Sequence, residues 1–94
     1  MASTSYSYIC RASWPPRTSV IMEVCKSFVG PAVGYAQILE RQVLDWFPQL
    51  NVPVTASIDE IADAAYQAAQ QIGGSTVYVR IEEGGQGTIR TMVP

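Results

Sequence analysis

Pro31–Phe47, PAVGYAQILERQVLDWF, is the segment around which we expect the chain to fold. Its apolar residues recur at helical spacing, which predicts an amphipathic helix with one face on a core. Proline suits the first helical position, where its missing N–H would be unpaired anyway, and Pro48 disfavours helix at the residue before it. We therefore expect a helix from Pro31 to about Phe47, whose main apolar arc comprises Ala32, Tyr35, Ala36, Leu39, Val43, Trp46 and Phe47.

This helix has more apolar surface than a single packing partner would cover. Val33 and Leu44 widen the main arc on one side, and Ile38 lies within the polar face. Large exposed apolar patches mark interfaces, and aromatic residues tend to anchor them. In the alternative, Val33 and Leu44 simply touch a second helix and Ile38 is one stray exposed residue. We favour an interface, formed by Val33, Ile38, Leu44 and Trp46.

A second helix is predicted to begin after Ser57. Ser57-Ile58-Asp59-Glu60 fits a capping box, in which the serine side chain accepts from the backbone N–H of Glu60 and the Glu60 side chain reaches back to the cap. Apolar residues then follow helical spacing as far as Ile72, and Gly73-Gly74 supplies the stop. The alanine-rich face of this helix suggests a close approach to a sheet or to the first helix.

Two segments in the N-terminal third predict a hairpin. Residues 5–14 alternate, which indicates a strand with one aromatic face. Residues 18–29 fit either a strand or a helix. Their β-branched content and the short turn at 14–17 favour a strand that pairs with the first. If they were a helix, the first strand would have to pair with the C-terminal hairpin.

A second hairpin is predicted at the C-terminus. Ser75–Glu82 reads as a strand with Val77, Val79 and Ile81 facing inward. Residues 83–87 form the turn, and Thr88–Val93 returns as the partner strand. The chain as a whole, residues 1–94, is therefore expected to be one small α+β domain. Its antiparallel sheet has about four strands in the order ββααββ, with both helices packed on one face and the two hairpins side by side.

Composition argues against several classes of partner. The chain has a formal net charge of −2, and its six basic residues are scattered, whereas nucleic-acid binding rests on clustered Lys and Arg. The sequence shows no signal peptide, no apolar run long enough to span a membrane and no basic face for lipid. We expect a complete cytoplasmic protein with reduced thiols at Cys10 and Cys25.

No signature of catalysis or of a cofactor stands out. The sequence has no histidine, which removes the commonest general base and metal ligand. Cys25 beside Lys26 could be an activated thiol, but a core cysteine is the better reading. Gly84-Gly85-Gln86-Gly87 lacks the helix that follows a phosphate loop, so a hairpin turn is favoured. We expect a protein that is not an enzyme and binds no metal or cofactor.

The sequence thus supports two functions. The first is a protein-interaction module, either a homo-oligomer, with a dimer favoured, or an adaptor or inhibitor of another protein. The alternative is a small-molecule-binding domain, because aromatic side chains commonly line pockets. Its pocket would lie between sheet and helices, lined by some of Tyr6, Tyr8, Trp14, Tyr35 and Tyr78, the last only if its face is the covered one.

Overall fold

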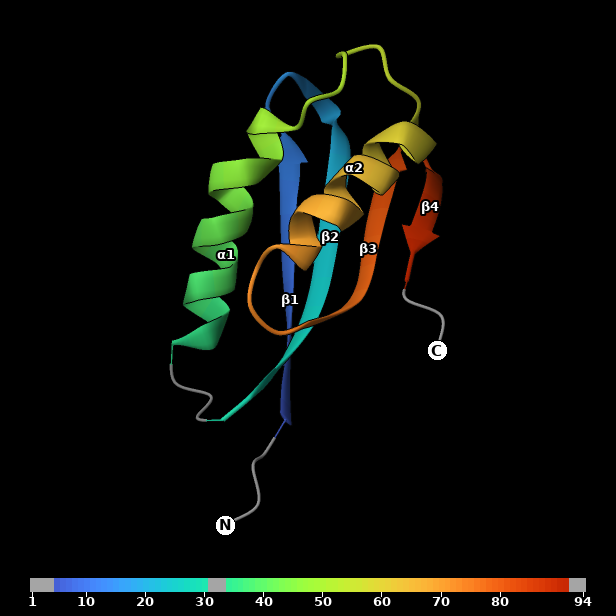
Figure 1. Ribbon diagram of the computed structural model, residues 1–94. Coiled ribbons are helices and arrows are strands. Elements are labelled where there is room, and N and C mark those ends of the chain that lie inside the picture. The colour runs from blue at the N-terminus through green and yellow to red at the C-terminus, as the bar shows by residue number, and fades with distance from the viewer. Residues whose placement is uncertain (1–4, 31–33, 92–94) are drawn as a thin grey trace.

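The computed structural model describes residues 5–30 and 34–91 as a four-stranded antiparallel sheet with two α-helices (Figure 1). The predicted α+β class is confirmed. The predicted order ββααββ is incomplete, because a short 3₁₀ helix that contains Pro48 stands between the two α-helices. The elements in chain order are β1 Ser5–Trp14, β2 Arg17–Val29, α1 Tyr35–Trp46, η1 Phe47–Gln49, α2 Ile58–Gln70, β3 Ser75–Glu83 and β4 Gln86–Arg90.

The sheet has the spatial order β1-β2-β3-β4, so β1 and β4 are its two edges. The prediction of a strand for residues 18–29 is confirmed, because β2 pairs with β1 on one side and with β3 on the other. Both faces of β2 carry apolar side chains, which explains why its pattern also resembled a helix. The two hairpins lie side by side through this β2–β3 contact.

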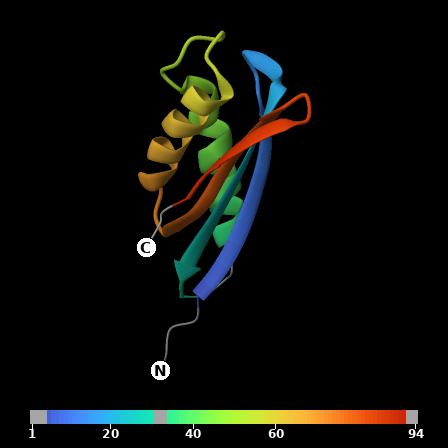
Figure 2. The same ribbon diagram turned by 90° about the vertical axis from the view of Figure 1, so that its right-hand side faces the viewer.

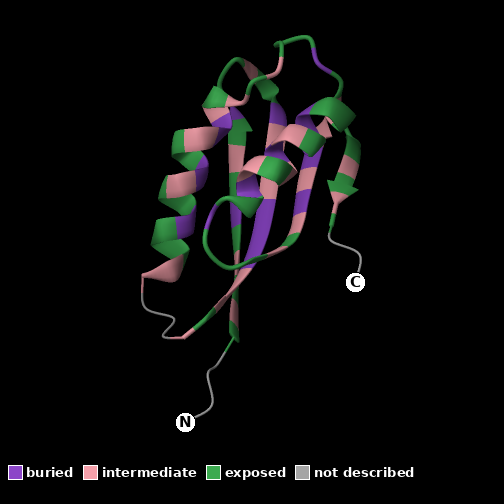
Figure 3. Cartoon of the chain, in the orientation of Figure 1, coloured by how far each residue is buried: buried purple, intermediate pink, exposed green. Residues whose placement is uncertain are grey.

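Side chains on one face of the sheet form most of the core. Val20, Met22 and Val24 of β2 are fully buried, as are Val79 and Ile81 of β3. Figure 3 shows this buried band along β2 and β3 beneath the helices. Figure 2 shows both helices on the same side of the sheet, where α1 packs against β1 and α2 against β3 and β4. Among the described residues, no helix covers the opposite face of the sheet.

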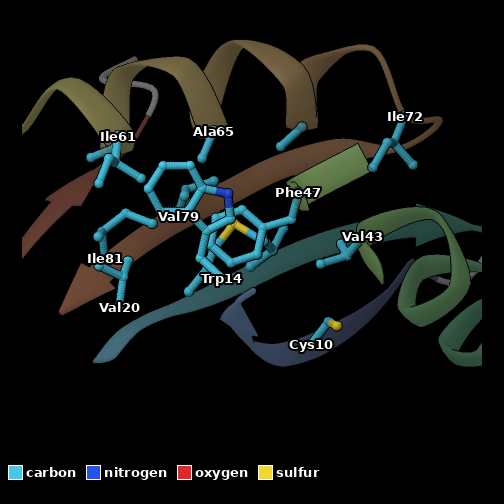
Figure 4. Packing of buried hydrophobic residues seen from close by; sticks show 14 of the residues in the cluster. Cys10, Trp14, Val20, Val43, Phe47, Ile61, Ala65, Ile72, Val79 and Ile81 are labelled. Carbon is cyan, nitrogen blue, oxygen red and sulfur yellow. The ribbon is translucent and has the colours of Figure 1, made fainter. Parts of the chain in front are cut away.

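Aromatic rings fill the core where α1 ends against β1. Trp14 is buried and stacks on Phe47, with 6.2 Å between ring centroids and 28° between planes. Trp46 meets the same Phe47 edge-on at 6.2 Å. Figure 4 shows Trp14 and Phe47 among Val79, Ile81 and Ile61, between sheet and α2. The end of α1 is therefore fixed by packing as well as by Pro48.

The observed start of α2 agrees with the prediction from the sequence, whereas the observed start of α1 does not. At α2, the hydroxyl of Ser57 accepts from the backbone N–H of Glu60 at 3.2 Å, as predicted, while the Glu60 carboxylate meets the same hydroxyl at 3.3 Å. At α1, the predicted start at Pro31 is too early. Gly34 has φ of 86°, which is not helical, so the helix begins at Tyr35. Residues 31–33 themselves lie outside the described residues.

The C-terminal hairpin forms as predicted, with two corrections. An irregularity of pairing beside Lys26 displaces Val77, which is 42% exposed and does not join Val79 and Ile81 in the core. The last strand is shifted toward the N-terminus, since β4 begins at Gln86, inside the predicted turn, and ends at Arg90 rather than at Val93. Met92 and Val93 fall outside the described part of the chain.

A single arginine fastens the connector between the helices. Arg17, at the start of β2, donates to the backbone oxygens of Val54 and Ala56 and forms an ion pair of 2.9 Å with Glu83. Ser19 also donates to that carboxylate. The hydrogen bonds from Ser19 and then from Arg17 hold the pKa of Glu83 below its usual value. The loop before α2 is thereby tied to the end of the sheet.

Candidate interaction surfaces

The outer surface of α1 carries two of the predicted interface residues. Ile38 is 50% exposed and Leu44 is 52% exposed. They are six positions apart on a helix, so their side chains point about 120° away from each other. Ile38 shares a hollow with Gly73 and Gly74 of the turn after α2, whereas the hollow at Leu44 is lined by α1 residues alone. Leu44 therefore faces away from α2.

Of the other two predicted interface residues, Trp46 and Val33, the structure describes only Trp46. Trp46 is half-buried and packs on Phe47, so its ring belongs to the edge of the core. Its indole nitrogen is buried with no hydrogen-bond partner, as is that of Trp14. Val33 lies outside the described residues. Of the predicted set, the structure leaves Ile38 and Leu44 as exposed apolar side chains.

The aromatic residues predicted to line a pocket are divided among three places. Trp14 is in the core, and Tyr78 points from the open face of the sheet, opposite the helices. Tyr6 and Tyr8 lie on the covered face of β1, where Tyr8 meets Phe28 at 5.9 Å. Phe28 meets Tyr35 at 5.0 Å. The fold therefore places apart residues that the sequence predicts to line one pocket.

A shallow cavity of about 460 Å³ lies beside Phe28 and Tyr35, with Gln42 and Gly74 on its other walls. The turn after α2 comes very close to β2 there: a Cβ at Gly74 would stand 2.5 Å from the carbonyl oxygen of Ser27. Glycine is required at this approach, and its φ of 89° also favours glycine. Of the predicted pocket residues, only Tyr35 lines this cavity.

The open face of the sheet carries a set of paired charges. Arg11 of β1 contacts Glu82 and lies 3.5 Å from Glu23, and Arg80 lies 3.1 Å from Glu82. Tyr78 donates to Glu23 at 2.6 Å, and this hydrogen bond is the main reason that the pKa of Tyr78 rises to about 12. These ion pairs between two arginines and two glutamates link β1, β2 and β3 on this face.

Lys26 is fully buried on the covered face of β2. Its Nζ donates to the carbonyl oxygens of Ala69 (2.6 Å) and Ile72 (2.8 Å) and to the hydroxyl of Thr76 (3.2 Å). The lysine thus caps the C-terminus of α2, whose last turn has no basic residue of its own. Burial lowers the pKa of Lys26. The alternation of Val20, Met22 and Val24 could have placed Lys26 on this face.

Neither cysteine is an activated thiol. Cys25 points to the open face while its neighbour Lys26 points to the covered one, so no ion pair joins them. Burial raises the pKa of both thiols, with smaller contributions from Glu40 at Cys10 and from Glu23 at Cys25. Raised pKa values keep the thiols protonated and weakly nucleophilic.

Residues 5–30 and 34–91 hold no cluster of three or more acidic or cysteine side chains able to bind a metal ion. They also hold no helix long and apolar enough to cross a membrane. Comparison with protein-family models, curated proteins and solved structures gives no match.

Proposed function

We propose that this domain is a non-enzymatic protein-interaction module that works in the cytoplasm as a homo-oligomer, or as an adaptor or inhibitor of another protein. The observation that carries the proposal is the half-exposed Leu44 on the side of α1 that faces away from α2. An apolar side chain of this size gains free energy when a partner removes it from water. Charged residues make up only 15% of the chain, which leaves apolar surface without a dense polar screen.

The arrangement of layers supports the same proposal. With both helices packed on one face, the other face of the sheet is open to a partner, and it presents Ile9 and Ile89 more than half exposed. Charges on this face are paired within the chain, so a partner need not supply compensating charges. The free, protonated thiols of Cys10 and Cys25 suit a reducing compartment.

Native mass measurement of the untagged protein tests this function. We expect a dimer at micromolar concentration, and we expect Leu44→Asp to shift the mass toward monomer because a charge would have to be buried in the interface. Ile38→Glu, on the side of α1 that faces the turn after α2, tests whether the interface extends to that side. Val54→Asp is the matched control, since Val54 is 48% exposed but lies in the connector. Circular dichroism verifies that each variant folds. An unchanged dimer mass in both helix variants would remove α1 from the interface, and a monomeric wild type would refute the homo-oligomer.

The second candidate function is small-molecule binding at the cavity beside Phe28 and Tyr35. The specific observation in its favour is a hollow of about 460 Å³ with two aromatic walls, a size in the range of ligand pockets. A bound compound would appear as added mass in the native spectrum or would raise the melting temperature in a metabolite panel. A clean apo mass with no stabilising compound argues against it.

A further inference from the structure

β1 is the longer of the two edge strands of the sheet, and its outer side pairs with no other strand of the described chain. β1 has ten residues, whereas β4, the other edge strand, has five. Monomeric proteins usually protect such an edge with short strands, prolines, bulges or repeated charges. β1 contains no proline and one charged residue, Arg11, and its only irregularity of pairing comes at Ser13/Trp14. This edge is open to pairing along most of its length.

We propose that a second copy of this chain pairs with β1 along this edge, antiparallel and in a register that sets Ile9 opposite Ile9. The two sheets then form one continuous sheet of eight strands about a two-fold axis at Ile9. The inference rests on the proposed homo-oligomer and specifies its interface. It commits to a second copy because β1 is complementary to itself in this register.

Side-chain size on the covered face supports the register. With Ile9 at the axis, Tyr6 stands opposite Ala12 and Tyr8 opposite Cys10, so each large residue meets a small one. Directly opposed side chains have Cβ atoms only about 5 Å apart, so this alternation avoids crowding. A register centred two residues later, on Arg11, would set Tyr8 against Trp14, which is already packed on Phe47. One centred two residues earlier, on Ser7, would set Tyr6 against Tyr8, two large residues.

The open face supports the same register. Ile9 is 64% exposed in one copy, and pairing at the axis brings two of these apolar side chains into contact. Arg11 stands opposite Ser7, so the two Arg11 residues are separated by about four strand positions, or roughly 13 Å. At that distance salt screens most of their repulsion. A register centred on Arg11 would instead oppose two like charges directly.

The position of α1 connects this edge with the proposed function. α1 is the helix that packs against β1. A second copy paired with β1 therefore lies beside α1, on the side of the molecule farthest from β4 (Figure 1). Isologous pairing of this kind closes the assembly at two copies, because each copy has one such edge.

Disulfide trapping tests the register. Directly opposed residues of an antiparallel pair have Cα atoms about 4.5 or 5.5 Å apart, which is within reach of a disulfide. Because Cys25 lies opposite Ile9 on β2 of the same chain, both cysteine variants are made in a Cys25→Ser background, where we expect Ile9→Cys to cross-link into a covalent dimer under mild oxidation. Ser7→Cys is the matched control: it lies on the same strand and face, but its two copies would be roughly 13 Å apart. The native thiols are 6% and 7% exposed, so the wild type should give little cross-linking.

A charge at the axis tests the interface without covalent chemistry. We expect Ile9→Lys to weaken dimerisation at least about tenfold, because two like charges would stand opposite each other. Ile89→Lys is the control, as Ile89 is 55% exposed on the same face of the other edge strand, and it should leave the dimer unchanged.

The outcomes separate the inference from the proposed function. Cross-linking of Ile9→Cys without Ser7→Cys, together with loss of the dimer in Ile9→Lys, supports the β1 pairing. A wild-type dimer that tolerates Ile9→Lys, or in which Ser7→Cys cross-links as readily as Ile9→Cys, overturns the pairing and leaves the homo-oligomer standing. A wild type that is monomeric throughout the micromolar range overturns both.

Discussion

The two edges of the sheet are held in different ways. β1 is long and is anchored by buried side chains, above all by Trp14 in its stack with Phe47. β4 is half as long and has no fully buried side chain. It is tied to α2 through Arg90, which lies 3.2 Å from Asp59 and 2.6 Å from Asp63.

The difference shows that a strand can be anchored firmly in the core and still have an edge free to pair with a partner. The well-anchored strand is the one with a long open edge, so β1 can offer its outer side to a partner without the strand itself coming loose. β4 is short and is fastened by ion pairs at the protein surface, which contribute little stability each. The edge that suits recognition is therefore also the edge that the core holds most firmly.

Trp14→Ala should have the largest effect on stability. Removing a large buried aromatic residue leaves a cavity, and we expect a loss of about 3–5 kcal/mol in the free energy of unfolding. Denaturant unfolding followed by circular dichroism measures it. Ser13→Ala, an exposed neighbour on the same strand, should change stability by less than about 0.5 kcal/mol. An equally small effect at Trp14 would mean that β1 is not held by the core.

Lys26→Met should loosen the β4 side, because Lys26 caps the helix that packs on β3 and β4. It leaves the buried carbonyl oxygens of Ala69 and Ile72 without their donor, and we expect a loss of about 2 kcal/mol. Hydrogen exchange should speed up in the last turn of α2 while β1 keeps its protection. A gain in stability would instead mean that removing the buried charge outweighs the lost hydrogen bonds.

The same lysine gives the stability of the protein a pH dependence. Burial lowers its pKa in the folded chain below the ordinary value of 10.5. Between those two values the unfolded chain binds more protons than the folded chain, so the free energy of unfolding rises with pH across that window. Lys26→Met should lack this rise, which a series of denaturation curves at increasing pH can show.

Arg90→Ala should have the smallest effect. Its two ion pairs with α2 are exposed to solvent, so we expect a loss of no more than about 1 kcal/mol. Adding salt to the wild type should reproduce part of this loss, because salt screens surface charges. A loss comparable to that of Trp14→Ala would show that the two edges are anchored with equal strength.

Much of the fold could be predicted because the local signals are strong. The alternation in β1, the hairpin at β3–β4 and the capping box at Ser57 each depend on neighbouring residues, and the structure confirms all three. The strand at β2 was harder to predict, since its two apolar faces also fit a helix. The short Pro15-Pro16 turn resolved that ambiguity correctly.

The remaining features depend on contacts that are distant along the chain. The capping role of Lys26 needs carbonyl groups more than forty residues away. The start of α1 was misplaced because the positive φ of Gly34 has no unique sequence signal. The sequence analysis assigns Ile38 and Leu44 to one interface, although their side chains point in different directions from α1. The open edge of β1 follows from the strand order, which no local pattern encodes.

The contacts of Phe47 also determine what optical measurements can report. Both tryptophans of the chain, Trp14 and Trp46, have their rings against this one phenylalanine. Tryptophan fluorescence will therefore follow the junction of β1 with the end of α1. A partial opening of β4 would leave the emission spectrum unchanged, so a fluorescence titration alone would record a single transition even where the far edge of the sheet separates first.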